Sequence, residues 1–159
     1  MSIDLVIPKV EVGRVMGLLE VLDDYGGKVD LAKVAADLLL DLDDILPVVD
    51  TAELVGFAKV EDGDVILTKK GFQFVSQGIR GRKKIIQERL KGLDLFKMID
   101  REIKSSEEGN LEKEELFSFL RTLVPEQEVD RLFKLIVEWG RHGLMLRYDS
   151  EDGKVCSLQ

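Results

Sequence analysis

Residues 54–68 read LVGFAKVEDGDVILT, and this stretch decides the fold. Two short runs rich in β-branched residues flank Asp62-Gly63, a dipeptide typical of two-residue β-hairpin turns. Gly56 precedes the first run and is typical of a helix end, whereas Thr68 follows the second run and is a good N-cap. The stretch therefore predicts a β-hairpin between two helices.

Apolar residues at helical spacing predict helices on the N-terminal side of this hairpin. These helices are residues 10–25, residues 31–39, and a third that begins at Asp41 or Asp43 and ends at Gly56. Gly26-Gly27 ends the first helix, residues 28–30 are extended, and Asp30 caps the second helix. Pro47 fits the third helix only in its first turn, where its missing N–H has no partner to lose. This order of elements predicts a winged helix-turn-helix.

The same order returns in the second half of the chain. Its predicted elements are helices at 82–90, 93–104 and 111–123, a helix that begins at Pro125 and ends at Gly140 or Gly143, and strands at 144–148 and 154–158. Residues 105–110 are polar and predict a linker. The chain is therefore predicted to be mainly α with small β-hairpins (α+β). Two winged-helix-like modules, 1–77 and 105–159, are joined by a basic helical connector, 78–104.

Composition limits the classes of function. Of 159 residues, 45% are hydrophobic and 34% are charged, which is typical of a folded soluble protein. The single cysteine excludes an internal disulfide, and one cysteine with one histidine excludes a zinc site built from these residues. No apolar run approaches the roughly 20 residues that span a bilayer, and the first residues do not resemble a signal peptide. A cytoplasmic location without membrane insertion is expected.

Positive charge is concentrated in the middle of an acidic chain. The net charge is −8 overall, but residues 69–104 carry +7 between ends of −10 and −5. The highest density lies in what we call the basic segment: Arg80, Arg82, Lys83, Lys84, Arg89 and Lys91. One interpretation is a solvated helix face that pairs with the acidic ends. The other is a docking surface for an acidic or phosphate-bearing partner.

The acidic residues disfavour DNA binding by the predicted winged helices. In this fold the second helix of the turn normally enters the major groove, beside phosphates. In the first module that helix has no basic residue from Asp41 to Phe57, and its charged residues are acidic. The hairpin that follows carries Glu61, Asp62 and Asp64. Such charges oppose the phosphate neutralisation on which affinity depends. A winged-helix transcriptional regulator remains the alternative, with the basic segment as its contact to DNA.

The sequence holds no motif that indicates catalysis. It lacks a phosphate-binding loop, a Gly-x-Ser-x-Gly nucleophile turn and a dinucleotide fingerprint. Cys156 lies in a predicted strand and fits a packed residue, and His142 follows a helix end. We therefore expect no enzyme activity, no catalytic or metal-binding residues and no cofactor. A small-ligand sensor with its pocket between the two modules is a further hypothesis.

Several stretches in order resemble the C-terminal AAA-associated domain. They are residues 14–20 with Gly26-Gly27, residues 54–68 with Gly71, residues 82–90, and residues 135–141 with Leu146 and Tyr148. Domains of this family are appended to ATPase subunits of ABC transporters of the nitrate, sulfonate and bicarbonate type, and they also occur as separate chains. The resemblance implies an accessory or regulatory domain without catalytic residues. It also implies that the partner is an ATPase subunit on another chain, and the basic segment is the predicted contact.

The helices after residue 84 carry more apolar residues than two separate small modules need. These apolar residues are Ile85, Ile86, Leu90, Leu93, Leu95, Phe96 and Ile99. Such residues are buried between the modules, in a homodimer, or in both. The sequence leaves these alternatives open.

Overall fold

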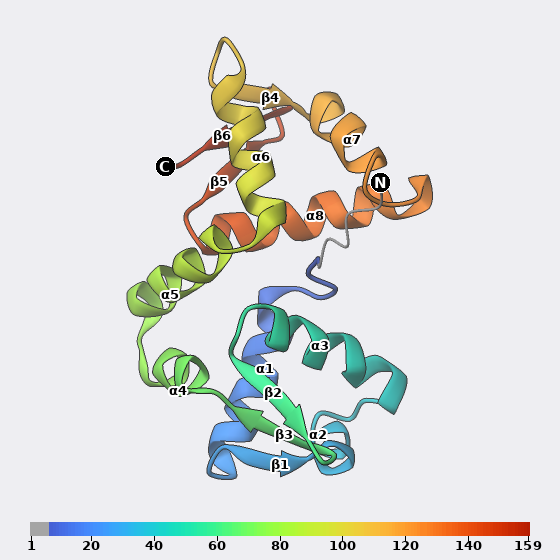
Figure 1. Cartoon of the computed structure of the whole chain (residues 1–159), viewed down its shortest axis with the longest axis vertical. Helices are drawn as coiled ribbons and strands as arrows, with labels where there is room; N and C mark the ends of the chain where they lie inside the picture. Colours follow the sequence, from blue (N-terminus) through green and yellow to red (C-terminus); the bar gives the residue numbers. More distant parts are fainter. Residues whose placement is uncertain (1–6) are drawn as a thin grey trace. The chain divides into compact units, whose positions relative to one another are not determined.

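Helices make up most of residues 7–159, the part of the chain that the computed structural model describes (Figure 1). Two small antiparallel sheets of three strands each complete the fold, as the prediction of an α+β chain required. The chain divides into two compact units, Pro8–Ile85 and Ile86–Gln159, here called the N-terminal and C-terminal units. Residues 1–6 of the predicted first module lie outside the described residues, and the division into 1–77, 78–104 and 105–159 stays a prediction.

The N-terminal unit places three helices and a sheet ahead of two further helices. Its elements are α1 (Val12–Asp24), β1 (Lys28–Asp30), α2 (Leu31–Asp37), α3 (Leu42–Leu54), β2 (Ala58–Glu61), β3 (Asp64–Leu67), α4 (Lys69–Ser76) and the start of α5 (Ile79–Lys91). Strand β3 lies in the middle of the sheet, in the order β1-β3-β2. Its central Val65 pairs with Val29 on one side and Val60 on the other.

Local turn and cap signals in the sequence predicted these boundaries correctly. The Asp30 carboxylate accepts hydrogen bonds from the backbone N–H groups of Ala32 and Lys33, and the Thr68 hydroxyl accepts one from Gly71 N–H. Both residues of the turn Asp62-Gly63 have positive φ, 52° and 82°, as the tightest hairpin turns require. The predicted hairpin is thus confirmed.

Pro47 is an exception, because it lies in the second turn of α3 and not in the first. A proline there cannot donate to the carbonyl of Asp43, which lies in an exposed part of the helix where water can take the place of the missing donor. The helix continues because Ile45, Val48 and Val49 are buried. The prediction treated Pro47 by local rules alone, and tertiary packing outweighs them.

The C-terminal unit contains six elements after the end of α5. They are α6 (Asp94–Ser105), β4 (Asn110–Glu112), α7 (Lys113–Arg121), α8 (Glu126–His142), β5 (Leu146–Asp149) and β6 (Lys154–Ser157). The prediction of one helix over 111–123 was wrong at its start. Leu111 lies in β4 and pairs with Val155 of β6, and the helix begins at Lys113. Pairing with a strand 44 residues away overrides the helical spacing of this segment.

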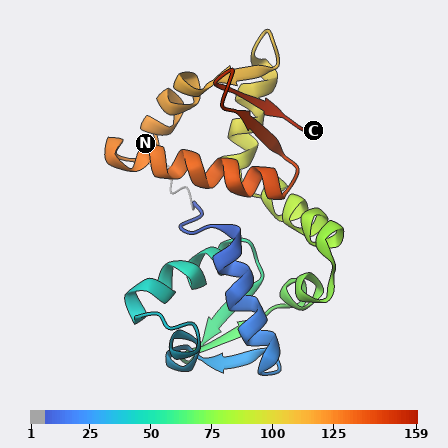
Figure 2. The same cartoon turned by 180° about the vertical axis from the view of Figure 1, so that it is seen from behind.

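The element order α1-β1-α2-α3-β2-β3 recurs as α6-β4-α7-α8-β5-β6, and the sheet order β4-β6-β5 matches β1-β3-β2 (Figures 1 and 2). Backbone hydrogen bonds recur as well. Leu31 N–H donates to Gly63 O in the first unit, and Lys113 N–H donates to Gly153 O in the second. Helix α6 contacts β4 and β6 and so serves as the first helix of the second set.

The apolar residues after position 84 lie mostly in the interior of the C-terminal unit. Buried among them are Ile86, Leu90, Leu95, Phe96 and Ile99. Leu90 and Ile86 approach Gly143 at the end of α8, where an added Cβ would lie 2.8 Å and 3.0 Å from their side chains. These five residues therefore form core, and a homodimer stays a prediction.

Leu39 has φ of +56° while its side chain is 92% exposed. A left-handed backbone is strained for leucine, and so exposed a side chain contributes little burial in return. Leu39→Gly is expected to raise the free energy of unfolding by about 0.5–1 kcal/mol. Urea unfolding followed by circular dichroism measures this change.

The matched control is Leu42→Gly, at an exposed leucine that begins α3. Glycine costs stability in a helix, so this variant is expected to unfold at lower urea. A lower midpoint for Leu39→Gly as well would show that the Leu39 side chain makes a stabilising contact.

Candidate protein-interaction site

Helix α5 carries all six residues of the basic segment, but they have different environments. The boundary between the two units falls inside this helix, so the residues up to 85 and those from 86 are treated separately. On the N-terminal side Arg80 and Lys84 are exposed, and Lys83 is half-buried. Arg80 and Lys84 are four residues apart and so lie on one face of the helix. None of these three has an ion pair within the described residues.

Arg82 instead makes contacts inside its own unit. Its Nε donates to the carbonyls of Phe74 and Gln77, at 3.2 Å and 3.0 Å, and its Nη2 donates to the Val75 carbonyl at 3.2 Å. Its guanidinium carbon lies 5.0 Å from the centre of the Phe74 ring, and Nη1 lies 3.7 Å from a Glu20 carboxylate oxygen. The side chain is only 24% exposed. Arg82 therefore caps the carboxyl end of α4, where orphan carbonyls and the helix dipole favour a cation.

Arg89 and Lys91 lie in the last turn of α5, within the C-terminal unit. Positive charge there is favourable because the helix dipole is negative at this end. Arg89 is half-buried and Lys91 is exposed. The structure thus brings Arg80, Lys83 and Lys84 together as one cationic surface, separates Arg82 from it, and places Lys91 at a cavity.

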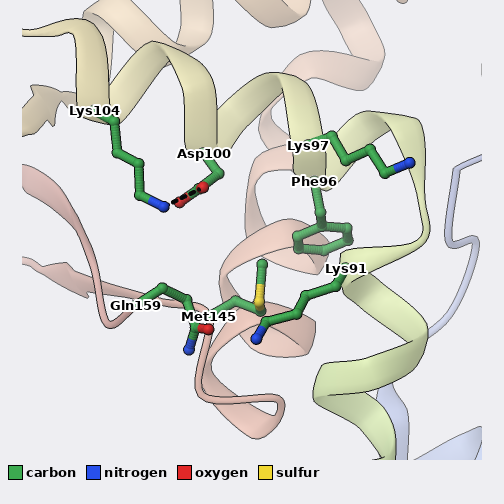
Figure 3. A pocket seen from close by; sticks show the side chains of 7 residues that line it. All are labelled: Lys91, Phe96, Lys97, Asp100, Lys104, Met145 and Gln159. Atoms are coloured by element: carbon green, nitrogen blue, oxygen red, sulfur yellow. Dashed lines mark ion pairs between the residues drawn. The ribbon is translucent and has the colours of Figure 1, made fainter.

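That cavity has a volume of about 230 Å³ and lies entirely within the C-terminal unit (Figure 3). Its lining residues are Lys91, Phe96, Lys97, Asp100, Lys104, Met145 and Gln159. Of these, the basic segment includes only Lys91. The others come from α6, from the residue before β5 and from residue 159, so no local motif joins them. The one sequence signal is that Lys97 and Lys104 are seven residues apart, which places them on one helix face.

Other ionisable groups show no arrangement for chemistry. No group of three or more His, Cys, Asp or Glu side chains among residues 7–159 could hold a metal ion. His142 Nε2 lies 3.9 Å from a Glu138 carboxylate oxygen one turn earlier. The Tyr25 hydroxyl donates to Asp37 at 2.6 Å, and this hydrogen bond raises the pKa of Tyr25. In the described residues no helix is both long and apolar enough to cross a membrane.

The face of α3 that would meet DNA in a winged helix is acidic. Asp43, Asp44, Asp50 and Glu53 are all exposed. Asp50 forms an ion pair with Lys9, whose Nζ lies 2.7 Å from Asp50 Oδ2. The surface of this helix therefore carries net negative charge.

Comparison with known proteins gives one match. The sequence model of a family described as the C-terminal AAA-associated domain matches residues 32–149, about three quarters of the chain. The matched range runs from α2 to the end of β5 and includes the whole basic segment. No curated protein and no solved structure matches the sequence.

Proposed function

Since the chain belongs to the C-terminal AAA-associated domain family, we propose that it is a non-catalytic accessory domain that docks on, and regulates, an ABC-type transporter ATPase carried by another chain. Membership of a family associated with ATPases is the observation that carries this proposal. Residues 1–159 contain no phosphate-binding loop, and in this proposal the partner hydrolyses ATP.

The cationic surface of Arg80, Lys83 and Lys84 supports docking on an acidic partner. Within residues 7–159 these side chains carry positive charge without an ion pair, on a chain whose net charge is −8. An unpaired cluster of one sign attracts an oppositely charged surface and speeds encounter. In this proposal Arg82 holds α4 in place. Arg89 and Lys91 belong to the C-terminal unit, and their part in docking stays a prediction.

We also propose that both units are winged-helix modules, and that contact with the partner protein is made through Arg80, Lys83 and Lys84 of α5 and not through the wings. In the N-terminal unit α2 and α3 would be the helix-turn-helix, and the β2-β3 hairpin would be the wing. The acidic face of α3 supports a protein partner over DNA, because negative side chains are repelled by phosphates. The fold alone does not decide between these uses.

The test is binding of the full chain to the purified ATPase subunit of a nitrate- or sulfonate-type ABC transporter from the same genome. Arg80→Glu/Lys84→Glu is expected to weaken binding by about ten-fold or more, because two favourable charge contacts become repulsive. Binding of the unaltered chain is expected to weaken as salt rises. Arg82 is left intact, since its replacement would disturb α4.

The matched control is Lys28→Glu/Lys59→Glu, which reverses two exposed lysines on the sheet of the same unit. It changes the net charge equally and is expected to bind as the unaltered chain does. Equal binding by all three proteins would contradict docking through α5. Absence of any binding would contradict the choice of partner.

The exposed cations of α5 are also the observation that favours the alternative, a DNA-binding regulator. Fluorescence anisotropy with random duplex DNA tests it, from low to physiological salt. Salt-sensitive binding that is lost in Arg80→Glu/Lys84→Glu would support the regulator. No binding at low salt would exclude it.

A further inference from the structure

The two units have corresponding backbone hydrogen bonds at the end of their sheets, but different side chains and elements surround that end. In the N-terminal unit Thr68 N–H donates to the Phe57 carbonyl at 3.1 Å, and α4 follows directly. Helix α4 contacts α1, and its Phe74 ring stacks on Phe57 with ring centres 4.7 Å apart. The end of this sheet is therefore covered by an aromatic side chain from the next helix.

In the C-terminal unit the same backbone bond joins Leu158 N–H to the Met145 carbonyl, at 2.9 Å. Met145 corresponds to Phe57 by a second bond as well. Met145 N–H donates to Gly140 O, and Phe57 N–H donates to Ala52 O. Four residues of α6, among them Phe96 and Asp100, line the cavity of about 230 Å³ beside Met145, and Met145 itself is 5% exposed.

The cavity combines an apolar floor with a positively charged wall. Phe96 and Met145 provide the apolar groups of the lining, and they are 1% and 5% exposed. In Figure 3 the Lys91 ammonium lies beside Met145, and Lys104 turns toward Asp100.

Asp100 is the one acidic residue that lines the cavity, and its charge is compensated. Lys104 Nζ lies 2.8 Å from Asp100 Oδ2, and the Ser157 hydroxyl donates to Asp100 Oδ1 at 3.2 Å. Lys91 and Lys97 have no ion pair within the described residues. Two positive charges are therefore left for a ligand, in a chain that is acidic overall.

We propose that this cavity binds a small organic anion that joins a carboxylate or phosphate to an apolar ring or short chain. The apolar part packs on Phe96 and Met145, and the anionic group lies near the Lys91 ammonium. The volume lies below the roughly 300–1,000 Å³ of pockets for drug-sized ligands, which favours a small ligand. This inference goes beyond the proposed function and does not depend on which protein the chain contacts.

The test is NMR titration of the full chain with three probes: benzoate, benzyl alcohol and inorganic phosphate. Benzoate has both features of the ligand, benzyl alcohol lacks the charge, and phosphate lacks the ring. Benzoate is expected to shift the Met145 methyl signal and the Phe96 and Lys97 amide signals in a saturable way. Benzyl alcohol and phosphate are expected to bind at least about five-fold more weakly.

Two variants are expected to change benzoate binding in opposite directions. Lys91→Gln removes a favourable charge and is expected to weaken it about five-fold, whereas Asp100→Asn removes a repulsive charge and is expected to strengthen it. The control Lys59→Gln, on β2 of the other unit, is expected to have no effect. A purely structural role of these side chains would not produce opposite changes.

The proposal is overturned if benzoate causes no saturable shift at these signals, or if phosphate binds as tightly as benzoate. It is also overturned if Lys91→Gln and Asp100→Asn leave benzoate affinity unchanged while both remain folded by their amide spectra. Because the readout uses small acids, failure here is distinct from failure to bind the ATPase.

Discussion

Phe74→Ala is expected to destabilise the N-terminal unit by about 3–5 kcal/mol, the range for truncating a fully buried aromatic side chain. Phe74 is 1% exposed and stacks on the fully buried Phe57. Its carbonyl also accepts from Arg82, whose guanidinium lies over the Phe74 ring. Truncation therefore leaves a cavity at the place where α1, α4 and the sheet end meet. It also removes the ring contact of Arg82.

The measurement uses the position of the single tryptophan, which lies in the C-terminal unit. Denaturant unfolding is followed by circular dichroism for the whole chain and by tryptophan fluorescence for the C-terminal unit. The control Phe72→Ala truncates a side chain on the same helix that is 43% exposed, and a much smaller loss is expected. Equal losses for the two variants would contradict a role for the Phe57–Phe74 stack.

Trp139→Ala is expected to destabilise the C-terminal unit by a similar amount, about 3–5 kcal/mol. Trp139 is 1% exposed in the last turn of α8, between the buried Ile136 and Gly140. A unit of this size is held by only about 4–11 kcal/mol at typical stability per residue. Loss of this side chain therefore brings residues 86–159 close to unfolding.

Hydrogen exchange measured by mass spectrometry tests this, because it separates peptides of the two units without a fluorescent probe. Faster exchange is expected throughout α8 and β4-β6-β5. The conservative variant Trp139→Phe keeps most of the buried area and is expected to lose much less stability. Unchanged exchange in Trp139→Ala would mean that the indole is not central to this core.

Features that depend on neighbouring residues could be predicted from the sequence. Asp30, Thr68 and the turn Asp62-Gly63 act within three or four residues of themselves, and each was assigned correctly. Strand β4 depends on distant pairing between Leu111 and Val155, so the local helical spacing misled the prediction. Pro47 was misplaced for the same reason, since burial of its neighbours supports the helix around it.

The candidate site was predictable only as a concentration of charge. The sequence placed Lys83 and Lys84 on a helix over 82–90 and left Arg80 outside it. In the structure α5 begins at Ile79, so it includes Arg80, and all three side chains are exposed or half-exposed. The sequence could not reveal that Arg82 is held by the end of α4, because that contact needs the fold of the preceding helix. The cavity at Met145 was missed because its residues come from separate parts of the C-terminal unit.

Phe57 and Met145 each accept the same kind of backbone hydrogen bond at the end of their own sheet, and this gives the repeated architecture a use in protein engineering. Two chain positions that hold the same hydrogen bond at the same sheet end are equivalent attachment points. Helix α4 begins one residue after Thr68. It can therefore be grafted after Leu158, the equivalent position of the second unit. Such a graft would extend the described residues of the second half to the element order of the first, so that the two halves would differ in sequence but share one order of elements.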